Sequence, residues 1–156
     1  MKSKGILIRD NKSTGEITTL DFSLNDVLKL IEHAEELNWA ILELEVTGGD
    51  LEERKWAQLR QFETSEEKVT RIDWEDLCEA SDKFWQIVWI TIIGCKDPKL
   101  VKSYQNDFEM YEACDVVIEV VDGGAFEVFS HNHSLIEHVR ETFKDTMLLK
   151  PDRKDL

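Results

Sequence analysis

Three histidines stand close together near the end of the sequence, at positions 131, 133 and 138. Neutral imidazoles at such short spacing can converge on one transition-metal ion, so His131, His133 and His138 are the candidate metal ligands. The alternative is that these polar side chains simply occupy a junction between a strand and a helix, where polar residues are common. We keep a metal-dependent enzyme as an alternative and expect no metal or other cofactor.

One cysteine also has a position suited to chemistry. Cys95 ends a long apolar segment just before a helix start at Asp97, and a thiol beside a helix N-terminus has a lowered pKa. With His131 or His133 as a base, Cys95 could act as a nucleophile. The competing interpretation is a small, soft side chain at a strand end.

The acidic residues limit the possible partners more strongly than any motif does. The chain has 33 Asp and Glu against 19 Lys and Arg, a formal net charge of −14 over 156 residues. Residues 43–82 hold thirteen acids against five bases, whereas residues 1–12 carry a net charge of +3 and residues 139–156 carry +1. Such a surface repels phosphate backbones and anionic lipid and attracts basic proteins. We therefore expect a basic protein partner, no nucleic-acid partner and no membrane partner.

Tryptophans occur among these acids, and aromatic anchors ringed by charge are typical of protein interfaces. The alternatives are that the acids form a solvated face and that the tryptophans fill the core. The predicted partner-binding surface consists of acids and tryptophans from the acidic middle of the chain: Glu43, Glu45, Asp50, Glu52, Glu53, Trp56, Asp73, Trp74, Glu75 and Asp76.

The elements that position these residues can be predicted from periodicity and turn residues. Hairpins are expected over residues 5–20 and 116–129, and helices over residues 24–37, 97–111 and 134–145, with capping boxes at Ser23 and Ser134. A strand at 39–46 should place Ala40 and Leu44 on one face. A strand at 84–93 should be covered on both faces, because it is apolar on both.

These elements, in the order ββαβ, an irregular middle and βαββα, predict the α+β class with about three main helices. The sheet should be mixed and mostly antiparallel, with two hairpins. With 42% hydrophobic residues and five Trp, we expect one domain over residues 1–149 and a polar tail over residues 150–156.

The compartment and the function follow as hypotheses. Three widely spaced cysteines and no apolar signal segment near Met1 favour the cytoplasm, and the longest apolar run is much shorter than a membrane-spanning helix. The leading hypothesis is a small acidic inhibitor or immunity-type protein that neutralises a basic toxin or nuclease. The alternatives are an enzyme that uses Cys95 or the histidines, and a homo-oligomeric structural or regulatory subunit such as a homodimer.

Overall fold

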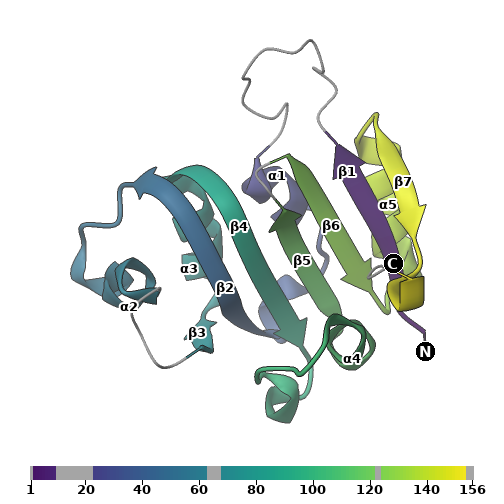
Figure 1. Cartoon of the computed structure of the whole chain (residues 1–156), viewed down its shortest axis with the longest axis horizontal. Helices are drawn as coiled ribbons and strands as arrows, with labels where there is room; N and C mark the ends of the chain where they lie inside the picture. Colours follow the sequence, from purple (N-terminus) through teal and green to yellow (C-terminus); the bar gives the residue numbers. More distant parts are fainter. Residues whose placement is uncertain (1, 10–22, 63–67, 122–123, 154–156) are drawn as a thin grey trace.

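The computed structural model describes residues 2–9, 23–62, 68–121 and 124–153 (Figure 1). The turn and return strand predicted over residues 10–20 lie outside the described residues, as do Asp122 and Gly123 of the second predicted turn.

A single seven-stranded sheet has the order β3-β2-β4-β5-β6-β1-β7, and every neighbouring pair is antiparallel. This confirms the α+β class and the mostly antiparallel sheet. Because β1 lies between β6 and β7, segments from the two ends of the chain are neighbours. The strands are β1 (Lys4–Arg9), β2 (Asn38–Gly49), β3 (Thr70–Ile72), β4 (Phe84–Cys95), β5 (Val116–Val121), β6 (Ala125–Ser130) and β7 (Thr146–Leu149).

Helices cover the sheet unequally, with α1, α3 and α5 behind it and α4 in front of it in the view of Figure 1. The capping box at Ser23 is confirmed, since Ser23 Oγ accepts from the Asp26 amide and Asp26 accepts from the Ser23 amide. The α-helices are α1 (Leu24–Leu28), α2 (Ala57–Arg60), α3 (Trp74–Lys83), α4 (Asp107–Ala113) and α5 (His133–Thr142), and the 3₁₀ turns are η1 (Ala34–Glu36), η2 (Arg54–Trp56), η4 (Pro98–Leu100) and η5 (Pro151–Arg153).

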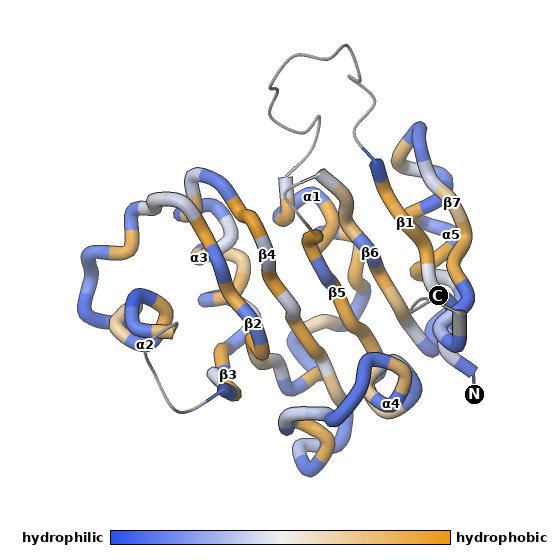
Figure 2. Tube along the Cα trace, viewed as in Figure 1, coloured by the Kyte–Doolittle hydropathy of each residue, from blue (hydrophilic) through white to orange (hydrophobic). Residues whose placement is uncertain are grey.

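Two hydrophobic cores result, one on each face of the sheet. The larger lies between the sheet and α1, α3 and α5, and the smaller lies under α4, where Tyr111 packs over Phe129. Figure 2 shows hydrophobic stretches along the central strands. In β4, Ile92 belongs to the larger core and Ile93 to the smaller, so the C-terminal half of this strand is covered on both faces as predicted. At its other end Trp85 is 71% exposed.

Two of the predicted helices are shorter than their periodicity indicated. The first ends at Leu28, and His33 then takes a left-handed conformation with φ of 56°. Ala34 belongs to the separate 3₁₀ turn η1, and its carbonyl accepts from Trp39 Nε1 at 2.8 Å. The helix predicted over 97–111 begins only at Asp107, because Asn106 caps the Glu109 amide at 2.9 Å. The cap of α5 is Asn132, which accepts from the Ser134 amide, rather than Ser134.

The predicted facing of β2 is wrong because this strand has a β-bulge. The register against β4 shifts between Ile41 and Glu43, so alternation restarts after Leu42. Leu44 therefore joins Ile41 in the larger core, whereas Ala40 faces the smaller one.

The two edge strands, β3 and β7, were not predicted, since each has only three or four residues and shows little alternation. None of the helices among the described residues combines the length and the apolar character that crossing a membrane requires.

Candidate partner-binding groove

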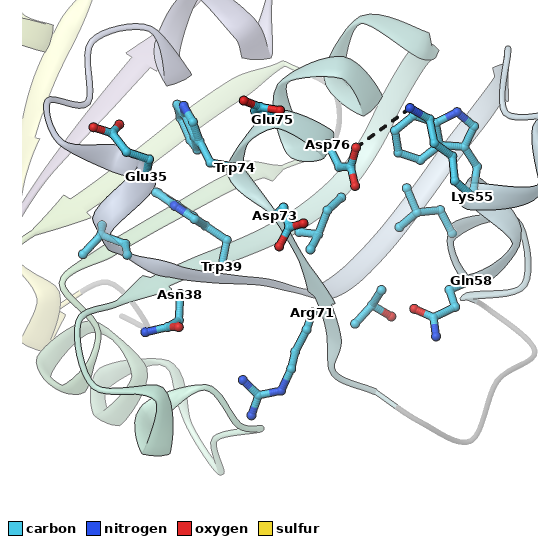
Figure 3. A pocket seen from close by; sticks show the side chains of 15 residues that line it. Glu35, Asn38, Trp39, Lys55, Gln58, Arg71, Asp73, Trp74, Glu75 and Asp76 are labelled. Atoms are coloured by element: carbon cyan, nitrogen blue, oxygen red, sulfur yellow. Dashed lines mark ion pairs between the residues drawn. The ribbon is translucent and has the colours of Figure 1, made fainter.

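A groove of about 710 Å³ opens beside the edge strand β3, between η2 and α2 on one side and the start of α3 on the other (Figure 3). We call it the acidic groove. Its lining includes Glu35, Asn38, Trp39, Lys55, Trp56, Gln58, Arg71, Asp73, Trp74, Glu75 and Asp76.

The tight junction between β3 and α3 places four consecutive lining residues together, Asp73, Trp74, Glu75 and Asp76. Ile72 pairs with Trp39 of β2, and the extended Asp73 then begins the helix, its carbonyl accepting from the Leu77 amide at 2.8 Å. The first turn of α3 therefore starts at the mouth of the groove. Its acids Glu75 and Asp76 suit that position, because negative charge is favourable near a helix N-terminus.

Two indoles form the aromatic wall. Trp39 is 3% exposed, and its ring centroid lies 5.0 Å from that of Trp74 at an interplanar angle of 34°. Gly94 on β4 leaves the room for Trp39, since a Cβ there would lie 2.7 Å from the ring. Trp39 is fixed by this packing and by its bond to Ala34, so the half-buried Trp74 is the aromatic surface offered to a ligand.

The opposite wall is built on Trp56, which is 2% exposed. Its indole Nε1–H has no hydrogen-bond partner among the described residues. Lys55 lies over this ring at 4.7 Å and contacts α3, with Nζ 2.7 Å from Glu79 and 3.9 Å from Asp76. The hydrogen bond to Glu79 raises the pKa of Lys55, so this cation is already paired within the protein.

The remaining charges give the groove a net negative character. Glu35, Asp73 and Glu75 form no ion pair within the part of the chain that the structure describes. The other cation, Arg71, donates to the Val101 carbonyl at 3.4 Å and points away from Trp74 in Figure 3. Three carboxylates without a cation therefore surround an accessible indole.

The structure brings together half of the predicted surface. Of the ten residues, Trp56, Asp73, Trp74, Glu75 and Asp76 line the acidic groove. The other five do not line it: the β2 residues Glu43 and Glu45, and the exposed Asp50, Glu52 and Glu53 of the segment after β2.

Glu43 instead lines a separate pocket of about 320 Å³ with Thr91 and Tyr104. Sequence reasoning missed Glu35, Trp39 and Arg71, because only the tertiary structure brings η1 and the paired strands β2 and β3 to Asp73.

The three predicted histidines do not converge on one site. His131 Nδ1 lies 4.0 Å from Asp115, His133 Nε2 donates to the Lys2 carbonyl at 3.0 Å, and His138 is exposed on α5. Among the described residues, no three His, Cys, Asp or Glu side chains gather as a metal site would require.

Cys95 has the opposite environment to that of an activated nucleophile. It is fully buried, and its hydrogen bond with Cys114, together with burial, raises the pKa of its thiol. A hydrogen bond from Cys95 lowers the pKa of Cys114. The Cys95 thiol therefore stays protonated near neutral pH and has no contact with solvent.

No protein-family model, no curated protein and no solved structure matches this chain.

Proposed function

We propose that this is a small acidic cytoplasmic binding protein, an inhibitor or immunity-type protein that neutralises a basic protein partner such as a toxin or nuclease. The supporting observation is the acidic groove, where Glu35, Asp73 and Glu75 surround the accessible face of Trp74. The three cysteines, all present as free thiols, suit a reducing compartment.

The mechanism has two steps. The net charge of −14 attracts a basic partner and speeds encounter at low ionic strength. A partner Arg or Lys side chain then lies on the Trp74 indole, and the groove carboxylates accept its hydrogen bonds. A neighbouring carbonyl of the partner can accept from Trp56 Nε1–H, which has no acceptor among the described residues.

The test compares two neutralised pairs of equal charge. Asp73→Asn with Glu75→Gln changes the groove, and Glu52→Gln with Glu53→Gln changes the acidic segment beside it. The probe is a fluorescent nonapeptide of alternating Arg and Gly, titrated at low salt. We expect the groove pair to bind about tenfold more weakly than the wild type, and the control pair to lose no more than about threefold.

Equal losses in the two variants would show that net charge, and not the groove, binds the peptide. A second arm uses wild type and both variants as bait in the native extract. The proposal requires one basic protein at stoichiometric level that is retained by wild type and by the control pair, released by high salt, and lost with the groove pair. Retention by all three baits would contradict it.

A further inference from the structure

A second pocket lies at the other end of the strand order, where β1 pairs with β7 beside α4 and η5. Its volume of about 530 Å³ falls within the range of about 300–1,000 Å³ that is usual for small-molecule sites. We call it the edge pocket, and its lining includes Ser3, Phe108, Leu149 and Lys150.

A buried hydroxyl without a partner lies in this pocket. Ser3 is 5% exposed, and its Oγ has no hydrogen-bond partner among the described residues. Strand alternation places Ser3 on the same face as Gly5, which contacts the Phe129 ring and Leu149 below α4. Because burial of an unpaired hydroxyl destabilises the fold, this donor is poised for an acceptor that enters the pocket.

The charged residues of the pocket are mainly basic. Three lysines, Lys2, Lys4 and Lys150, oppose two acids, Glu112 and Asp152. This local excess of positive charge stands out in a chain whose net charge is −14. The acceptor that fits Ser3 is therefore anionic.

The walls are apolar and open. Phe108 is 43% exposed, and the half-buried Leu149, which pairs with Gly5, lies on the same face of the sheet as α4. Exposed apolar side chains at a concave site are typical of ligand-binding grooves. An aliphatic chain would cover both.

We propose that the edge pocket binds a small carboxylate that carries an unbranched aliphatic chain. The carboxylate accepts from Ser3 Oγ–H and pairs with the lysine ammonium groups, while the chain lies between Phe108 and Leu149.

The test is calorimetric titration of the purified protein with decanoate, with decylammonium as the charge control. Decanoate should bind one per chain, and decylammonium should not bind detectably. Affinity should rise by about fourfold for each methylene added from hexanoate to decanoate. Equal binding of decanoate and decylammonium, or no dependence on chain length, would overturn the proposal.

Variants locate the binding and separate it from folding. Ser3→Ala should weaken decanoate binding by about tenfold while thermal stability stays equal or rises, a combination that a purely structural serine would not give. Leu149→Ser should weaken it, whereas Met147→Ser, a change on the same face of β7 but outside the pocket lining, should not.

Lys150→Gln should weaken binding more than Lys29→Gln, since Lys29 is exposed at the end of α1. Unchanged affinity in Ser3→Ala or Leu149→Ser would overturn the proposal. So would light scattering that shows a concentration-dependent dimer lost in Leu149→Ser, because it would assign the edge to a second copy of the chain.

Discussion

The two ends of the sheet share the same packing arrangement beneath surfaces of opposite charge. Near the acidic groove, Trp39 covers Gly94 of the neighbouring strand, and near the edge pocket, Phe129 covers Gly5. A second aromatic ring then packs on each: Trp74 on Trp39 at 5.0 Å, and Tyr111 on Phe129 at 3.7 Å. An aromatic ring on a cross-strand glycine is thus a support that both sites share.

The two supports differ in the charge and exposure of the residues that surround them. The groove is built from residues 35–76, which carry a net charge of −8, and its aromatic rings are mostly buried. The edge pocket is built largely from the two ends of the chain, which are basic, and its apolar side chains remain exposed. The comparison teaches that strand pairing, more than net charge, decides which charges meet at a site.

The largest expected effect is the loss of the buried support at the groove. Trp39→Ala should lower the free energy of unfolding by about 3–5 kcal/mol, because it leaves a cavity and removes the bond to the Ala34 carbonyl. Leu148→Ala at the other end should cost no more than about 0.5 kcal/mol, since that side chain is 54% exposed. Urea unfolding measures the free energy of unfolding of both variants. Equal losses would contradict the contrast between a buried end of the sheet and an open one.

Substitution of the two covered glycines tests whether the supports act independently. Gly94→Ala and Gly5→Ala should each cost about 1–3 kcal/mol, because the added methyl group meets the ring of Trp39 or of Phe129. Gly94→Ala should weaken binding of the Arg-Gly peptide and leave decanoate binding unchanged, and Gly5→Ala should do the reverse. If either variant impaired both sites equally, the two ends would be one coupled unit.

A smaller effect is expected at Tyr111, the second ring of the edge support. Its hydroxyl donates to Glu119, whose side chain is 3% exposed, so Tyr111→Phe removes one donor from a buried carboxylate. The loss should be about 1–2 kcal/mol at neutral pH, measured by urea unfolding. The matched change Tyr104→Phe, at a half-buried tyrosine that donates to the Leu100 carbonyl, should cost less.

The same variant has a pH signature. Burial, followed by the negative charge of Glu119, raises the pKa of Tyr111 above the usual 10.0. The folded protein therefore retains this proton where the unfolded chain loses it, and the free energy of unfolding falls as the pH rises past 10. Tyr111→Phe should lose stability less steeply there than the wild type, while the buried Cys95 contributes equally to both. Parallel alkaline slopes would contradict the assignment.

Local patterns predicted much of the secondary structure. The capping box at Ser23, the apolar strand ending near Cys95 and the hairpin of β5 with β6 are each encoded by adjacent residues, and each is present. Helix length was less predictable, since periodicity continued past Leu28 and before Asp107 while caps and tertiary contacts set the actual ends. The bulge at Leu42 likewise reversed the predicted facing of β2, because the register of β2 against β4 is a tertiary contact.

The sequence by itself therefore determined the α+β class, the antiparallel character of the sheet and the acidity of the middle of the chain. Capping, turn formation and alternation act over a few neighbouring residues, so they can be identified without the fold. Only the tertiary structure decided the strand order, which brings Trp39 to Trp74 and Ser3 to Leu149. Such pairings depend on burial and register between distant segments, and no local pattern specifies them.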